Sequence, residues 1–139
     1  MVKMANVSEE EQLATIHEIV SAFAPETHAM NQYMNAQNRE SKVGDSYVRV
    51  FETSSITSCC KVGMQATRDL GDEIVKLYPN NNQANKIAVI AWKEYVSLAQ
   101  KFYAYAPKGD AEAYAEKIKK VEPTYVMPKK AGCISFGWL

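Results

Sequence analysis

The stretch that decides the fold is residues 82–106, which read NQANKIAVIAWKEYVSLAQKFYAYA. Nothing in it breaks a helix before Pro107 and Gly109, so it predicts a helix of 25 residues, about 37 Å long. Its polar side chains fall in one narrow stripe, and apolar side chains occupy most of the circumference. A helix of this kind must be contacted on several sides. We therefore predict a single all-α domain over residues 1–139, a helical bundle of four to six helices around this central one.

Helical periodicity outside this stretch predicts the neighbours of the central helix. Ser8 and Glu11 form an S-x-x-E capping box, and apolar residues recur at helical spacing up to Pro25, which predicts a helix over 8–24. Further helices are expected over 27–44, 64–78 and 110–121, the last of them capped by Asp110.

The helix expected over 64–78 is amphipathic. One face carries Leu70, Ile74, Leu77 and Tyr78. The opposite face carries Arg68, Asp69, Asp72, Glu73 and Lys76. In the helix over 110–121, Tyr114 and Ile118 are expected to face inward.

Two structures compete for residues 47–62. The alternation of Val48 and Val50 with their neighbours, and the Ser, Thr and Cys residues that follow, indicate a short β-hairpin. A lone hairpin between helical neighbours would have little to pair with, so we favour a helix. This helix would turn Val48, Phe51, Ile56 and Cys60 inward.

The two ends of the chain differ in character. Residues 1–7 are expected to form a flexible leader. Residues 124–139 follow Pro123 and are too apolar for a free tail, so we expect them to lie extended on the body of the protein or on a partner.

The net charge of the chain is zero, because sixteen Lys and Arg residues balance sixteen Asp and Glu residues. This balance argues against a whole-surface attraction to nucleic acid or to an anionic membrane. It is a cancellation, since residues 1–85 carry a net charge of −4 and residues 86–139 a net charge of +4. We expect the two halves to neutralise each other across the bundle.

The cysteines indicate the compartment. Cys59, Cys60 and Cys133 are an odd number, which fits a reducing compartment better than a disulfide framework. A bridge from Cys59 or Cys60 to Cys133 is the alternative. The longest apolar run, residues 87–92, is far too short for a membrane span. We expect a cytoplasmic protein; the alternative is a secreted or periplasmic one whose signal peptide has been removed.

Sequence signatures of catalysis are missing from the chain. The two histidines, His17 and His28, do not follow a glutamate at the spacing that di-iron bundles use, and they form no recognised zinc spacing with the cysteines. The sequence contains neither a nucleophile elbow nor a phosphate-binding glycine loop. We therefore predict no catalytic residues, no metal and no cofactor.

Tyrosine is in excess, with eight of the fourteen aromatic residues, and five tyrosines alternate with lysines in the last third of the chain. This pattern is compatible with single-stranded nucleic acid, which we do not expect because arginine is absent after Arg68. We expect the rings to pack between helices with their hydroxyl groups reaching water. A small-molecule pocket walled by Trp92, Tyr95 and Phe102 is a further alternative.

These observations predict a non-enzymatic binding protein that engages a protein partner or associates with itself. The residues expected to contact the partner lie in the apolar tail: Ile134, Phe136, Trp138 and Leu139. The first alternative is a helical bundle that carries a small molecule next to Trp92. The second is an enzyme or redox sensor that uses a reactive thiol at Cys59 or Cys60.

Overall fold

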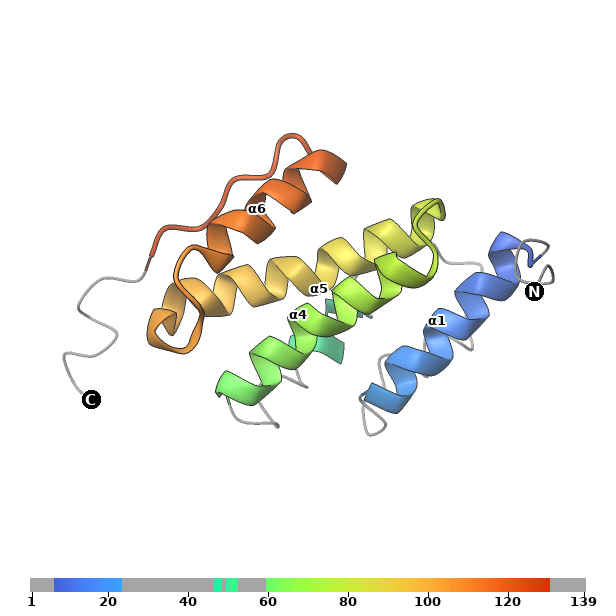
Figure 1. Ribbon diagram of the computed structural model, residues 1–139, viewed down its shortest axis with the longest axis horizontal. Coiled ribbons are helices and arrows are strands. Elements are labelled where there is room, and N and C mark those ends of the chain that lie inside the picture. The colour runs from blue at the N-terminus through green and yellow to red at the C-terminus, as the bar shows by residue number, and fades with distance from the viewer. Residues whose placement is uncertain (1–6, 24–46, 49, 53–59, 131–139) are drawn as a thin grey trace.

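The computed structural model describes residues 7–23, 47–48, 50–52 and 60–130 (Figure 1). Over these residues the chain is a helical bundle without strands, which confirms the predicted fold class. The helices are α1 (Glu9–Phe23), α4 (Cys60–Leu77), α5 (Asn82–Lys101), the 3-10 helix η2 (Tyr103–Tyr105) and α6 (Asp110–Val121). The helix predicted over 27–44 lies outside the described residues.

Helix α5 is the centre of the bundle. It packs against α4, α6, η2 and α1, and Figure 1 shows it between α4 on one side and α6 on the other. Half of its residues are buried, so the prediction that several elements contact this helix is confirmed. Its first turn is capped by Asn81, whose side-chain oxygen accepts from the Ala84 N–H at 3.1 Å.

The end of the central helix was predicted wrongly. Helix α5 stops at Lys101, five residues before Ala106, because Phe102 leaves helical geometry with φ −120° and ψ 56°. The chain continues as η2, where the Phe102 and Tyr105 rings stack at 6.1 Å and Gln65 Nε2 donates to the Tyr105 carbonyl at 2.8 Å. These contacts outweigh helix propensity, and the helix of 20 residues is about 30 Å long.

Helix α1 has the predicted bounds to within one residue at each end. The Ser8 hydroxyl accepts from the Glu11 N–H at 3.1 Å, and the Glu11 carboxylate accepts from the Ser8 N–H at 3.2 Å. This is the predicted capping box. Ile16 and Val20 bury the inward face of the helix.

The segment at residues 47–52 is helical wherever it is described, so the hairpin alternative is not found there. Phe51 is buried as predicted, but the prediction that Val48 faces inward was wrong, since Val48 is 39% exposed. The inward face consists of Tyr47, Val50 and Phe51, which lie at positions i, i+3 and i+4 of a helical turn. Ile56 lies outside the described residues.

Helix α4 begins at Cys60, four residues before its predicted start, and it also differs from its prediction at one apolar position. Leu70 and Ile74 are buried, whereas Leu77 is 39% exposed. Leu77 is the last residue of α4, and its side chain lines a surface hollow with Gln12 next to the turn at residues 78–81. The helix therefore ends before another element covers this side chain.

The segment after α6 packs against the body of the protein, as predicted, up to the last described residue, Lys130. Tyr125 and Met127 contact the core, and Gln100 Nε2 donates to the Pro128 carbonyl at 2.7 Å. None of the helices in the described part of the chain is long and apolar enough to cross a membrane.

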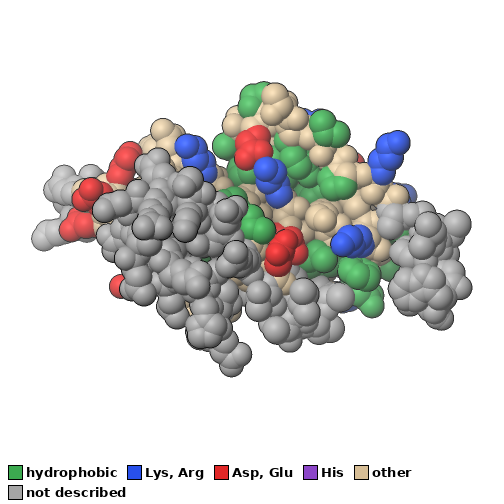
Figure 2. All heavy atoms as spheres, turned by 180° about the vertical axis from the view of Figure 1, so that it is seen from behind, with side chains coloured by type: hydrophobic (Ala, Val, Ile, Leu, Met, Phe, Trp, Pro, Cys, Tyr) green, Lys and Arg blue, Asp and Glu red, His purple; other side chains and the backbone are tan. Residues whose placement is uncertain are grey.

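The charges of the two halves are partly separated on the surface. Acidic side chains gather at the end of the molecule where α1 lies, and on the side of α5 and α6 lysines are spread with acidic side chains among them (Figure 2). Two ion pairs between described residues join the halves. The pair between Lys117 and Asp72 has the expected polarity, whereas the pair between Arg68 and Asp110 has the reverse polarity.

High salt is expected to destabilise the protein slightly. Raising NaCl from about 0.05 M to about 1 M screens the exposed charge pairs, each of which contributes about 1 kcal/mol or less, and should lower Tm by roughly 3 °C. Thermal unfolding followed by circular dichroism measures this change. A Tm that does not depend on NaCl would show that the acidic and basic faces do not interact.

Candidate functional site: the groove between α4, α5 and α6

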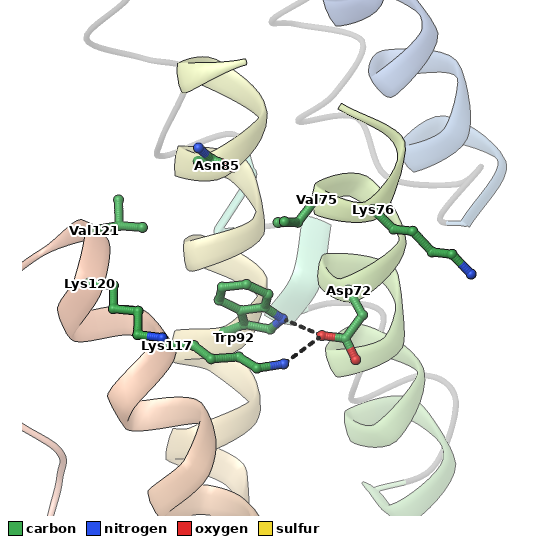
Figure 3. Close-up of a pocket in the computed structure, with 8 residues that line it drawn as sticks. All are labelled: Asp72, Val75, Lys76, Asn85, Trp92, Lys117, Lys120 and Val121. Carbon is green, nitrogen blue, oxygen red and sulfur yellow. Dashed lines mark hydrogen bonds and ion pairs between the residues drawn. The ribbon is translucent and has the colours of Figure 1, made fainter. Parts of the chain in front are cut away.

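An open groove of about 420 Å³ lies where α4, α5 and α6 meet, and we call it the α4–α5–α6 groove (Figure 3). Apolar side chains line it from all three helices: Val75 of α4, Trp92 of α5 and Val121 of α6. Its polar lining residues are Asp72, Lys76, Asn85, Lys117 and Lys120. The groove is therefore a partly apolar surface next to several charged groups.

Trp92 holds the central position in this groove. Its side chain is only 6% exposed, its indole N–H donates to Asp72 Oδ1 at 3.2 Å, and its ring packs edge-on against Tyr114 at 5.8 Å. Gly71 makes this position possible, because a Cβ atom at residue 71 would lie 2.6 Å from the indole nitrogen and 3.2 Å from the Ala88 carbonyl oxygen. The close approach of α4 to α5 thus depends on a glycine.

The Asp72 carboxylate joins the three helices. One oxygen accepts from the Trp92 indole of α5, and the other accepts from the Tyr114 hydroxyl of α6 at 2.5 Å. Burial, followed by the hydrogen bond to Asp72, raises the pKa of Tyr114, so this tyrosine stays protonated and keeps donating. The carboxylate is anchored by two donors from the protein interior.

Lysines of α6 supply positive charge at the groove. The Lys117 ammonium lies 4.3 Å from the centre of the Tyr114 ring, 5.4 Å from that of Trp92 and 3.7 Å from Asp72 Oδ1. In Figure 3 its side chain runs beside Trp92 toward Asp72. Lys120 also lines the groove from α6, whereas the Lys76 side chain on α4 points away from the other lining residues.

A second polar cluster lies further along the same three helices. Asp110 Oδ2 accepts from Arg68 Nη1 at 3.0 Å and from the Tyr95 hydroxyl, and the Arg68 guanidinium lies 5.3 Å from the centre of the Tyr95 ring. Burial, followed by the hydrogen bond to Asp110, raises the pKa of Tyr95. This cluster ties α6 to α4 and α5 and leaves no open space for a ligand at Tyr95, which is fully buried.

The prediction that Asp110 caps α6 was wrong. The N-cap residue is Gly109, which has a φ of +80°, and the Asp110 carboxylate binds Arg68 and Tyr95 instead. A left-handed backbone conformation at residue 109 favours glycine and turns the chain sharply into α6. Asp110 is the first residue of the helix and not its cap, so its side chain bonds to the neighbouring helices and not to the backbone of α6.

The pocket residues predicted from the sequence do not form a single site. Trp92 lines the groove, Tyr95 is buried and bound to Asp110, and Phe102 is 38% exposed beside η2, where it stacks on Tyr105. Asp72, Lys117 and Val121 were not predicted as site residues. The amphipathic pattern of α4 placed Asp72 with its charged face, and no local signal showed that this face meets α6.

Several predicted site residues cannot be placed. The tail residues Ile134, Phe136, Trp138 and Leu139 lie outside the described residues, as do Cys59 and Cys133. Cys60 begins α4, but its side chain is not among those described.

His17 is a buried histidine of α1, only 7% exposed, and its Nδ1 atom forms a hydrogen bond with the Tyr47 hydroxyl. Burial lowers the pKa of His17 from 6.5 to about 4. No cluster of side chains able to hold a metal ion is found among the described residues, and His28 lies outside them.

The tyrosine hydroxyl groups do not all reach water as predicted. Those of Tyr95 and Tyr114 donate to the Asp110 and Asp72 carboxylates between the helices. The rings pack at 5.5 Å from each other in an edge-on arrangement, which confirms that these tyrosines lie between helices. By contrast, Tyr105 is 42% exposed.

Comparison with known proteins adds no assignment, since no protein-family model, curated protein or solved structure matches the chain.

Proposed function

We propose that the protein is a non-enzymatic helical binding module that engages a partner protein through the α4–α5–α6 groove. The expected occupant is a short segment of the partner that carries acidic side chains next to apolar ones. The observation that carries this proposal is the position of Lys117 and Lys120 beside the apolar groups of Trp92 and Val121.

The apolar lining supports the hydrophobic part of this recognition. Val121 at the end of α6 is 39% exposed, so a partner that covers it removes apolar surface from water. The opposite wall, Val75 of α4, is half-buried and packs against the core, which gives the groove a rigid base. A preformed groove limits the ordering cost of binding on this side of the interface.

The charge of α6 supports the acidic part. Lys117 and Lys120, three residues apart, line the groove from this helix. Asp110 and Glu112 lie in the first turn of α6, and Glu116 pairs with Lys119 at 3.7 Å, away from the groove lining. Charge complementarity of this kind mainly raises the association rate and selects against basic partners.

Small-molecule carriage is the second candidate, because a volume of about 420 Å³ falls within the range of ligand pockets. Such pockets usually enclose most of the ligand surface, whereas this groove is open to solvent. An open groove fits an extended or helical peptide better than an enclosed small molecule. Native mass spectrometry of freshly purified protein tests this candidate: a retained adduct on the 15.6 kDa chain would favour it over the protein partner.

Three other hypotheses stay predictions. The apolar tail residues 134–139 extend the partner surface or support self-association. A reactive thiol at Cys59 or Cys60 serves a cysteine-dependent enzyme or a redox sensor. The protein resides in the cytoplasm, with a secreted or periplasmic location as the alternative.

The groove is tested by selecting peptides of about twelve residues from a displayed random library on the full chain. We expect the selected peptides to combine acidic and apolar residues and to shift the NMR signal of the Trp92 indole N–H, which is assigned from its loss in Trp92→Phe. Val121→Ser combined with Lys120→Gln should weaken peptide binding by about ten-fold, because it removes one apolar wall and one charge.

The matched control is Val62→Ser, since Val62 is an exposed valine of α4 that does not line the groove. Its affinity for the selected peptides should equal that of the unaltered chain. The proposal is wrong if no peptide is enriched, if the enriched peptides lack acidic residues, or if the groove variant and the control bind equally well.

A further inference from the structure

The contact between Lys117 and Asp72 occupies the position in the groove where a partner's carboxylate would bind. Asp72 Oδ1 lies 3.7 Å from the Lys117 ammonium, which also lies over the rings of Tyr114 and Trp92. The lysine that should recognise an acidic partner is thus already paired with a carboxylate of its own chain.

Asp72 does not depend on Lys117 for its hydrogen bonds. The Trp92 indole N–H and the Tyr114 hydroxyl already donate to its two oxygens, at 3.2 Å and 2.5 Å. If Lys117 moved away, the carboxylate would keep both donors and would not become an unsatisfied buried charge. The ion pair is therefore the weakest of the three contacts that Asp72 makes.

The Lys117 side chain can also move away from this ion pair. Its side chain is 46% exposed and that of Asp72 is 39% exposed, so water screens the pair and replaces its contacts at little cost. The long aliphatic stem of the lysine, which runs beside Trp92, lets its ammonium shift toward the open side of the groove (Figure 3). A carboxylate arriving from that side competes directly with Asp72.

We propose that the Asp72–Lys117 ion pair is an autoinhibitory contact, and that binding exchanges Asp72 for a carboxylate of the partner as the ion-pair partner of Lys117. The inference rests on the proposed function, since it specifies how an acidic segment enters the same groove. In this exchange Asp72 lowers the affinity for the partner by competing for Lys117, and Lys117 binds the partner's carboxylate.

A double-mutant cycle on the full chain tests the exchange. The probe is 3-phenylpropionate, an apolar carboxylate, and its affinity is measured from the shift of the Trp92 indole signal. Asp72→Asn keeps oxygen and nitrogen atoms for the Trp92 and Tyr114 hydrogen bonds but releases Lys117, so it should raise the affinity about three- to five-fold. In a Lys117→Met background the same substitution should have no effect.

The Lys117→Met background distinguishes two reasons for a gain in affinity: release of Lys117 from Asp72, and loss of the repulsion between the Asp72 carboxylate and the probe. Repulsion between Asp72 and the probe would persist without Lys117, so an equal gain in both backgrounds overturns the proposal. The absence of a gain in the unaltered background overturns it as well. The neutral analogue 3-phenylpropanamide should bind all variants alike. Asp69→Asn, at an exposed carboxylate of α4 that does not line the groove, should leave the affinity for 3-phenylpropionate unchanged.

A measurement on the unaltered chain covers the case in which Asp72→Asn does not fold. The ammonium NMR signal of Lys117, identified by its loss in Lys117→Met, should shift on titration with 3-phenylpropionate and not with the amide. An unmoved signal overturns the proposal. Because the probe is not a peptide, these results do not depend on the peptide selection. If Asp72→Asn raises the affinity only when Lys117 is present but no peptide is selected, the proposed protein partner is wrong and the ion-pair exchange stands. If peptides are selected but the double-mutant cycle shows no such dependence on Lys117, the exchange is wrong and the protein partner stands.

Discussion

Gly71→Ala should destabilise the protein by about 2 kcal/mol, although alanine is the better helix former. In an exposed helix the change from Gly to Ala would stabilise by about 1 kcal/mol. At residue 71 the new Cβ atom would lie 2.6 Å from the indole nitrogen of Trp92 and 3.2 Å from the Ala88 carbonyl oxygen. The indole is held by Asp72 and Tyr114, so α4 and α5 must separate, and overpacking against both a ring and a backbone oxygen costs about 3 kcal/mol. Subtracting the gain in helix propensity leaves a net loss of about 2 kcal/mol. Thermal unfolding should show Tm lower by roughly 6 °C.

The partner substitution Trp92→Leu identifies the cause. With the smaller leucine at residue 92, Gly71→Ala should become neutral or stabilising, because the indole that the Cβ atom meets is gone. Ala113→Gly at an exposed position of α6 measures the intrinsic difference between the two residues and should cost about 1 kcal/mol. A loss from Gly71→Ala that is the same in both backgrounds would mean that Trp92 is not the source of the strain.

Much of the helical framework follows from local patterns in the sequence. The capping box at Ser8 and the proline at residue 25 are both within a few residues of the helix ends that they determine, and α1 has the predicted bounds. The same holds for α6, whose predicted bounds agree with the structure. Residue periodicity is a local signal, so it locates helices and their apolar faces without knowledge of the partners.

The end of α5 and the roles of the charged residues depend on contacts between distant segments. Phe102 leaves the helix where its ring stacks on Tyr105 and where Gln65 of α4 binds the following turn. Asp110 has the residue type of a cap, yet it is the first residue of α6 and binds Arg68, which is 42 residues away in the chain. A pattern that assigns one charged face to a helix cannot tell whether that face meets solvent or a third helix.

The groove is the least predictable feature for the same reason. Its lining comes from three helices, and only Trp92 was a candidate from the sequence. The sequence feature related to this site is Gly71, which was not recognised as a contact position. It brings α4 close to the indole of Trp92 and Asp72 within reach of the indole N–H group. A glycine inside an amphipathic helical pattern marks a possible close contact, but it does not identify the residue on the other side.

Acidification should destabilise the protein through His17. The pKa of this buried histidine is lowered from 6.5 to about 4 in the folded state, and in the unfolded chain it returns to about 6.5. Above pH 6.5 the imidazole is neutral in both states and contributes no pH dependence. Below that pH the unfolded chain binds a proton that the folded chain does not. The free energy of unfolding should therefore fall by about 1.4 kcal/mol per pH unit, to a total of about 3 kcal/mol near pH 4.

His17→Gln isolates this contribution, because glutamine does not titrate and still offers an oxygen to the Tyr47 hydroxyl. Urea unfolding at several pH values between about 5 and 6.5 avoids most of the range in which carboxylates titrate. Over this window the free energy of unfolding should fall by about 2 kcal/mol more in the unaltered chain than in His17→Gln.

The comparison uses the slope of the free energy of unfolding with pH, so a general loss of stability in the variant does not affect it. The reference is the slope of the unaltered chain. If His17→Gln also keeps that slope, or if NMR titration of the folded protein places the pKa of His17 near 6.5, burial of the neutral imidazole between α1 and the helix at residues 47–52 does not explain the acid sensitivity.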